Sequence, residues 1–347
     1  MDPAAGVDVA EPPLEESTAP GEPAEGAEAP KGEKAATVDK SKARLAFLLR
    51  LAATVALVAA LFRLVDGRAF LAALVGADLR FLLGIVLLRP ALYGVRAWRF
   101  WHLADAACER PLPRGPAMWW HFVSLNLGTF TPAGLGEVSL VYFMRRRGHG
   151  AGPTVVAMVL DKVITLAMVS AMGLVGAVLY LGLDRAWLAA AALLGLGLLA
   201  ASEPVRRGLR RLRPSGDGKV ARAVDALDPI FAFARRHPLA LLVNIGAAAV
   251  QSLIFTAQIW LGFRMLGHVV DFMGIFWLSG VGRLANMLPV TLGGLGVYEG
   301  SMVLLFGRLG AQAEAALAAV LLPRTLTWIV AGAVIAGFVW WRGGGER

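Results

Sequence analysis

The sequence predicts an all-α polytopic membrane protein, built as an inverted repeat of about six spanning helices and two re-entrant hairpins. Two observations support this fold class. The chain of 347 residues is 57% hydrophobic and only 17% charged, which is too apolar for an ordinary soluble domain. In addition, one unusual break in an apolar segment occurs twice, and corresponding broken segments in two halves are typical of transporters with inverted repeats.

The first part of the chain, residues 1–40, is predicted to be a disordered acidic tail. It contains ten acidic and three basic residues, with six prolines among alanine, glutamate and glycine. A segment of this composition cannot bury enough apolar surface to fold. It also lacks the basic start and apolar stretch of a signal peptide.

Eight apolar segments follow the tail, and a spanning helix needs about 20 mainly apolar residues. The segments comprise residues 45–65, 79–98, 117–144, 153–182, 187–202, 239–263, 272–307 and 312–341. The segments 117–144 and 272–307 contain the breaks. Each of these two is therefore either one broken span or a hairpin of two half-helices.

The basic residues favour the hairpins, because loops rich in lysine and arginine stay cytoplasmic. Basic residues precede the first span, and they occur on both sides of segment 117–144, which ends at Arg145–Arg147. Both ends of this segment are thus predicted to be cytoplasmic, as are both chain termini. The second broken segment then enters from the outside. Eight complete spans remain an alternative, in which Arg145–Arg147 lie outside.

The domain boundaries follow from this order of segments. Residues 41–202 form the first membrane repeat, 203–238 a basic cytoplasmic loop, and 239–347 the remainder of the second repeat. The loop holds nine basic and four acidic residues, a composition that attracts anionic lipid. It lacks interleaved aromatic residues, so nucleic-acid binding is not expected.

The two breaks share an asparagine, a threonine and glycines at matching spacing, and each is followed by a glutamate. The first contains Asn126, Thr131, Pro132, Gly134, Gly136 and Glu137, and the second contains Asn286, Thr291, Gly294, Gly296 and Glu299. A half-helix that ends in the membrane presents unpaired N–H groups and a positive dipole end, which suit a phosphate. We therefore predict that the breaks form a lipid-phosphate path, whose site the two halves expose in alternation. The alternative is that the glycines only let helices pack closely.

Charged residues inside the apolar segments extend the candidate site. Arg89, Tyr93 and Arg96 share one helix face and are predicted to line a basic wall, because ionisable residues at membrane depth face a cavity or a partner. An alternative for Arg96 and Arg99 is that they reach the cytoplasmic interface.

An acid and a base recur at equal spacing in the two halves. Glu137 precedes Lys162 by 25 residues, and Glu299 precedes Arg324 by 25. Each pair is either a structural ion pair or a gate that releases a phosphate ligand. Asp161 is a second possible partner in the first half, or it faces the headgroups.

Three stretches resemble the membrane domain of bacterial lysylphosphatidylglycerol synthases and its flippase-like stand-alone relatives. These are Arg96-Ala-Trp-Arg99, the break from Asn126 to Glu137, and Leu292-Gly-Gly-Leu-Gly-Val-Tyr-Glu-Gly300. The resemblance covers about residues 45–341. It implies lipid translocation in the bacterial cytoplasmic membrane. The soluble domain that transfers lysine in the two-domain synthases is missing from this sequence, so aminoacyl transfer is not expected.

The predicted function is translocation of an anionic or aminoacylated phospholipid, or of a lipid-linked intermediate, between leaflets. The alternatives are a small-solute or ion carrier, and a membrane enzyme or accessory subunit of lipid-linked envelope glycan synthesis. No cofactor or metal is expected, since the five histidines show no ligand spacing. The expected partners are membrane lipids and a separate synthase or envelope-biosynthesis protein.

Overall fold

The computed structural model describes residues 48–49, 51–61, 63, 66–108, 110–130, 136–182, 219–287, 291 and 294–344. Of residues 219–227 and of a few others, mainly in the last helix, only the backbone is described. The predicted acidic tail and the predicted span 187–202 lie outside this part of the chain. All regular structure in the described residues is helical, which confirms the all-α fold class.

Ten labelled helices follow a short apolar helix at Leu51–Leu61. They are α2 (Gly67–Val75), α3 (Leu79–Ala107), α4 (Arg114–Phe130), α5 (Ser139–Arg145), α6 (Ala151–Leu181), α9 (Lys219–Arg236), α10 (Pro238–Met265), α11 (Phe272–Asn286), α12 (Val297–Gly307) and α13 (Ala313–Gly344). Within the described residues, α3, α6, α10 and most of α13 are long and apolar enough to cross a membrane. The protein is therefore a multi-pass membrane protein.

Local signals in the sequence account for several helix ends. Asp78 begins α3 by accepting a hydrogen bond from the Arg80 amide at 3.0 Å, and Asp271 begins α11 by accepting one from the Gly274 amide at 2.5 Å. The C-cap of α6 is Gly182, whose φ of 64° is a left-handed conformation that favours glycine.

The helices α3 to α6 recur as α10 to α13. The clearest match is the turn after the short helix of each half, where Gly148 and Gly310 have φ angles of 80° and 79°. In each turn the residue after the glycine donates its amide hydrogen back to the last turn of the helix. These bonds join His149 to Met144 and Ala311 to Phe306, both at 3.1 Å. The sequence repeat is thus a structural repeat.

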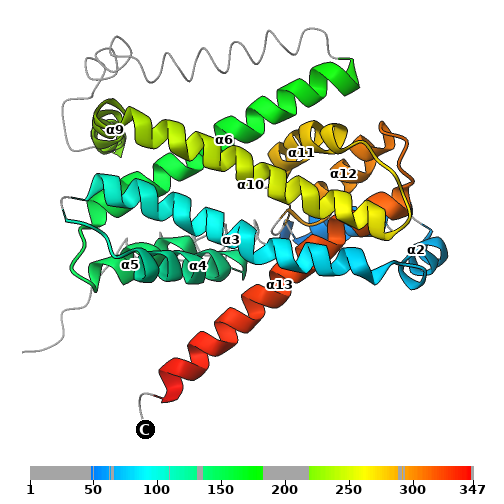
Figure 1. Ribbon diagram of the computed structural model, residues 1–347, viewed down its shortest axis with the longest axis horizontal. Coiled ribbons are helices and arrows are strands. Elements are labelled where there is room, and N and C mark those ends of the chain that lie inside the picture. Colours follow the sequence, from blue (N-terminus) through cyan, green and yellow to red (C-terminus); the bar gives the residue numbers. More distant parts are fainter. Residues whose placement is uncertain are drawn as a thin grey trace, which may run out of the picture. The chain divides into compact units, whose positions relative to one another are not determined.

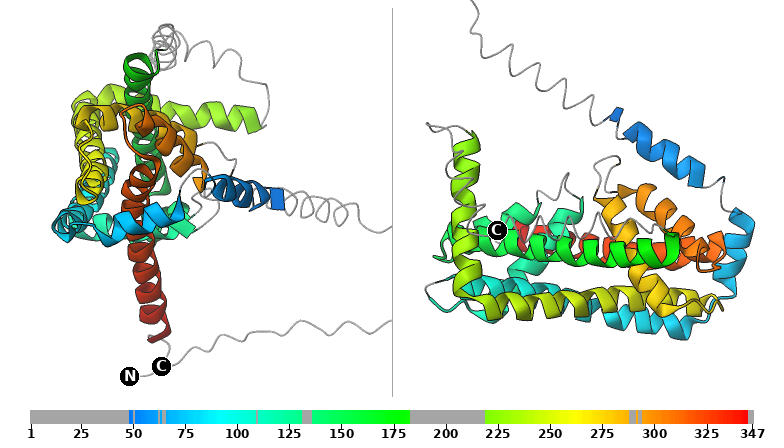
Figure 2. Two further views of the ribbon diagram at one scale, coloured as in Figure 1. Left: turned by 90° about the vertical axis from the view of Figure 1, so that its right-hand side faces the viewer. Right: turned by 90° about the horizontal axis from the view of Figure 1, so that it is seen from above.

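The two halves are inverted, because their first long helices pack antiparallel (Figures 1 and 2). Asn244, near the start of α10, contacts Arg99, near the end of α3. At the opposite end, the amide of Asp78 donates to the carbonyl of Met265 at 2.8 Å. Two further contacts join the halves in an exchanged manner: α6 packs against α11, and α13 packs against α4.

Each broken segment consists of two helices that fold back on each other. In the first half, the Ser124 hydroxyl of α4 donates to the carbonyls of Gly136 and Glu137 at 3.1 and 2.8 Å. A side chain at Gly136 would lie 2.3 Å from the Leu127 carbonyl carbon, so only glycine permits this approach. The longer arms, α4 and α11, have 17 and 15 residues, fewer than the roughly 20 that a span needs. This geometry supports the predicted hairpins.

The predicted cytoplasmic loop over residues 203–238 contains a helix in its second half. Residues Lys219–Arg236 form α9, which includes Pro229. The segment has a high content of charged residues, but its apolar residues recur at helical spacing, so that one face is apolar. Phe233 on that face is buried against the core of the first half.

Thiol labelling tests the predicted orientation of the first hairpin. In a variant without Cys108, a cysteine at position 145 should react with a membrane-impermeant maleimide from the cytoplasmic face, and one at 184 from the outer face. Cys108 must be replaced, although burial raises the pKa of its thiol, and the Asp105 carboxylate raises it further. Labelling of position 145 from outside would contradict the hairpin topology.

Candidate functional site

A groove with both polar and apolar walls lies between α3, α4 and α13. Its volume is about 540 Å³, within the range of about 300–1,000 Å³ that is typical of ligand sites. The lining residues are Val86, Arg89, Pro90, Tyr93, Gly94, Ala97, Gly115, Met118, Trp119, Phe122, Leu326 and Val330. Arg89 and Tyr93 share the groove, as their spacing predicted, but Arg96 does not line it.

Arg89 is a buried cation without an acidic partner among the described residues. Its side chain donates to the backbone carbonyl of Pro323 in α13, and its Nε atom has no described hydrogen-bond partner. The residue is only 7% exposed. Since a buried charge is costly unless it is paired, the groove is suited to an anionic group at Arg89.

Tyr93 connects the groove to the first break. Its hydroxyl donates to Oδ1 of Asn126 at 3.5 Å, and the Asn126 amide donates to the Phe122 carbonyl at 2.7 Å. The Tyr93 and Phe122 rings also meet edge to face, with centroids 5.1 Å apart. Asn126 is therefore buried directly behind the groove wall.

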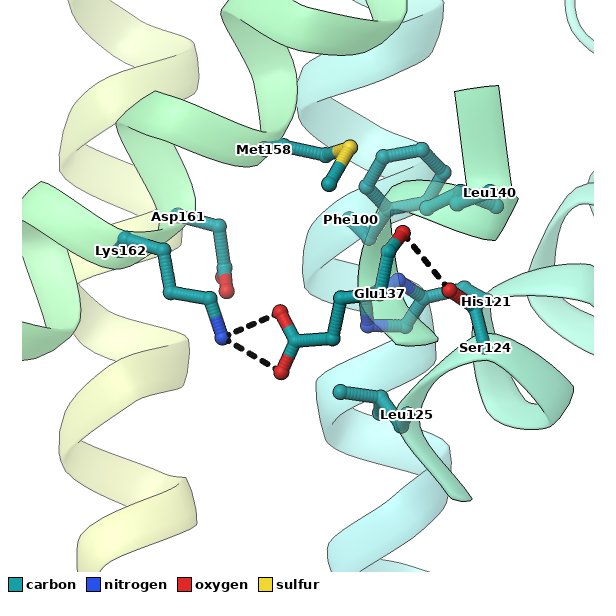
Figure 3. A pocket seen from close by; sticks show the side chains of 9 residues that line it. All are labelled: Phe100, His121, Ser124, Leu125, Glu137, Leu140, Met158, Asp161 and Lys162. Atoms are coloured by element: carbon teal, nitrogen blue, oxygen red, sulfur yellow. Dashed lines mark hydrogen bonds and ion pairs between the residues drawn. The ribbon is translucent and has the colours of Figure 1, made fainter. Parts of the chain in front are cut away.

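The first acid–base pair forms an ion pair at the side of a small pocket (Figure 3). Nζ of Lys162 lies 2.6 and 2.9 Å from the two carboxylate oxygens of Glu137. The Lys162 side chain is 54% exposed and that of Glu137 is 23% exposed. This pair is accessible and joins the first hairpin to α6.

The second acid–base pair, Glu299 with Arg324, is buried and stabilises the start of α12. One Glu299 oxygen accepts from Arg324, and the other accepts from the Gly296 amide at 2.8 Å, at the start of α12. Arg324 also lies 5.4 and 5.5 Å from the ring centroids of Tyr298 and Trp328. Both predicted pairs thus exist in the structure, but their surroundings differ.

The interpretation of Arg99 as a residue that reaches the interface was wrong. Its side chain is 1% exposed and binds three helices together. It contacts Asp161 and Thr165 of α6 at 3.0 and 3.2 Å, and Asn244 and Gln251 of α10 at 3.0 and 2.6 Å. Asp161 is therefore the partner of Arg99, and Glu137 pairs with Lys162 instead.

The structure describes only some of the remaining predicted site residues. Thr131, Pro132 and Gly134 lie outside the described residues. Thr291 is buried, and its hydroxyl has no partner among the described residues. Asn286 is exposed at the end of α11, where it lies against Gly294. The structure therefore does not establish a common site for the two breaks.

Sequence reasoning missed Arg283, a second mostly buried arginine. Its guanidinium donates to the Ser252 hydroxyl at 3.3 Å and lies 5.2 Å from the Phe255 ring centroid. No acidic partner of Arg283 is present in the described ranges. The available signal was an ionisable residue inside the apolar segment 272–307.

The charges within these packed helices do not balance. Among the candidate-site residues, the acidic side chains are Glu137, Asp161 and Glu299, whereas the basic ones are Arg89, Arg96, Arg99, Lys162, Arg283 and Arg324. Three of the cations have described carboxylate partners. The excess of positive charge in an apolar interior favours an anionic ligand.

Comparison with known proteins gives one match. The family model described as Lysylphosphatidylglycerol synthase TM region matches residues 47–335. No curated protein and no solved structure matches the chain.

Proposed function

Because the chain belongs to the lysylphosphatidylglycerol synthase TM region family, we propose that it moves lipids between the leaflets of the bacterial cytoplasmic membrane. The proposed substrate is an anionic or aminoacylated phospholipid, or a lipid-linked intermediate. The observation that supports this function most directly is Arg89, the unneutralised cation in the apolar groove.

The groove provides a surface for an acyl chain. Its walls are aliphatic and aromatic, apart from Arg89 and Tyr93. Two of its lining residues, Trp119 and Val86, are 57% and 43% exposed, so the groove opens to the surface of apolar helices. In a bilayer this surface faces lipid, and a chain can enter sideways without crossing water.

Arg89 provides the matching contact for a headgroup. A guanidinium presents paired donors that suit phosphate oxygens, and such charge-assisted hydrogen bonds are stronger than neutral ones. Its present partner is only a backbone carbonyl, which a phosphate can replace. A lipid bound here would have its phosphate at Arg89 and an acyl chain along α4 and α13.

Substitution of Arg89 tests this function in reconstituted vesicles with a leaflet-resolved assay of fluorescent phosphatidylglycerol. Arg89→Gln should slow transport about tenfold or more, because a charge-assisted hydrogen bond contributes about 1.5–3 kcal/mol. Arg89→Lys should retain part of the rate, since the charge remains. The matched control is Arg80→Gln on the same helix, whose side chain is 93% exposed and whose loss should leave the rate unchanged.

The outcomes separate the candidate functions. Transport by the Arg89→Gln variant at the wild-type rate would reject the proposed headgroup contact. Vesicles in which the wild-type protein moves small ions but no lipid would favour the carrier. Lipid that is chemically altered rather than moved would favour the membrane enzyme.

A further inference from the structure

The inverted repeat creates two lateral contacts between helices that occupy equivalent positions. In this structure the two contacts differ in how closely their helices pack. One is the contact of α4 with α13, which contains the groove. The other is the contact of α6 with α11, the counterparts of α13 and α4 in the repeat. If the halves alternated in function, each contact would have to open and close in turn.

The α6–α11 contact is closed by backbone packing. A side-chain carbon at Gly280 would lie 2.1 Å from the Gly173 nitrogen, and one at Gly176 would lie 2.6 Å from the Trp277 carbonyl oxygen. Small residues of this kind let membrane helices approach closely and pack over a long surface.

The α4–α13 contact lacks the glycines that let α6 and α11 approach closely. At the offset of 162 that aligns α6 with α13, Gly173 and Gly176 correspond to Ile335 and Phe338. The two glycines of α6 therefore have no counterpart at these positions of α13. Arg89, the arginine of the groove, also has no counterpart on α10, which carries no charged residue between His237 and Arg264.

We propose that lipids enter and leave through the α4–α13 contact alone, and that the α6–α11 contact stays closed throughout transport. This inference rests on the proposed function and adds its route. The occupant of the α4–α13 groove is a phospholipid, with an acyl chain on the apolar wall and its phosphate at Arg89. The two halves are then not equivalent in transport, although they are related in sequence.

A matched pair of glycine substitutions tests the open side. Gly94 lines the groove, and a Cβ atom there meets no atom within 4 Å, so Gly94→Phe introduces a ring at the groove wall. Gly246 on the equivalent helix α10 also has open space, but it lies outside the groove. Gly94→Phe should slow transport about tenfold or more, whereas Gly246→Phe should retain the wild-type rate. Equal rates in the two variants would overturn the assigned route.

Reversible cross-links test the closed side in a Cys108→Ser background. One pair, Tyr180→Cys with Asp271→Cys, joins α6 to the start of α11, where the wild-type side chains lie 3.4 Å apart. The other pair, Trp119→Cys with Val330→Cys, crosses the groove. A flexible, reducible bis-maleimide should leave transport intact in the first pair and stop it in the second. Reduction of the linker should return each variant to the rate that it had before linking, which shows that the protein remained folded.

Different results would reject the one-sided route and the proposed function. Transport that stops reversibly when α6 is linked to α11 would show that this contact must open, and would overturn the one-sided route while lipid transport itself stands. Unchanged transport with the groove cross-linked would overturn it as well. A wild-type protein that moves no lipid in the same vesicles would instead reject both proposals.

Discussion

Removal of the Asp161 carboxylate is expected to destabilise the protein by about 3 kcal/mol or more, because it leaves the Arg99 charge buried without its acid. Asp161→Asn changes little in shape, so the loss should come from the charge. The remaining partners, Asn244 and Gln251, supply only neutral oxygens. Thermal unfolding in detergent and steric trapping in bicelles would measure the effect.

The adjacent residue provides the control for this prediction. Lys162→Met removes a charge from the next position of α6, but that side chain is 54% exposed, so a loss of less than about 1 kcal/mol is expected. The double variant Arg99→Met with Asp161→Leu should recover part of the stability lost in Asp161→Asn, since it removes both buried charges. A single variant as stable as the wild type would contradict the assigned role of Arg99 as the link between α3, α6 and α10.

The second large effect is expected from Gly136→Ala, at the point where the first hairpin closes. The new side chain would lie 2.3 and 2.4 Å from backbone atoms of Leu127 and Gly128. Neither group can move without shifting α4, so we expect a loss of about 3 kcal/mol, at the upper end of overpacking effects. Lipid transport should fall in parallel, because α4 forms one wall of the groove.

Gly152→Ala is the matched control for the hairpin. Gly152 is in the first turn of α6, and a side chain there meets no atom within 4 Å. Alanine is the better helix former by about 1 kcal/mol, so this variant should be as stable as the wild type or slightly more stable. If Gly136→Ala unfolded at the same temperature as Gly152→Ala, the close approach of α4 to the returning chain would be refuted.

The two acid–base pairs show why related positions need not share a role. Glu299 both begins α12 and neutralises Arg324, and it is buried. Glu137 and Lys162 are accessible and lie beside a pocket. A phosphate can compete for Lys162 from the surface, whereas Arg324 is held by an acid and two aromatic rings. Of the two, only the Glu137–Lys162 pair suits the gate that the sequence suggested.

The sequence by itself determined the class of the protein, the long apolar helices and the two breaks. These features depend on local properties: apolar length sets a span, and proline and glycine interrupt a helix wherever they occur. The equal spacing of Glu137–Lys162 and Glu299–Arg324 was also sufficient to predict both ion pairs. A repeated sequence places its residues in repeated contacts, so the pattern identified partners without a structure.

Only the tertiary structure decided which charges are neutralised and where the groove lies. The position of Arg99 in α3 predicted an interfacial residue. In the structure, α6 and α10, which lie far along the chain, bury it and supply its partners. Arg89 lies inside the apolar segment 79–98, yet its neighbour α13 offers it a backbone carbonyl and no acid. Burial and pairing depend on which distant helices pack around a side chain, and hydropathy and spacing along one segment do not contain that information.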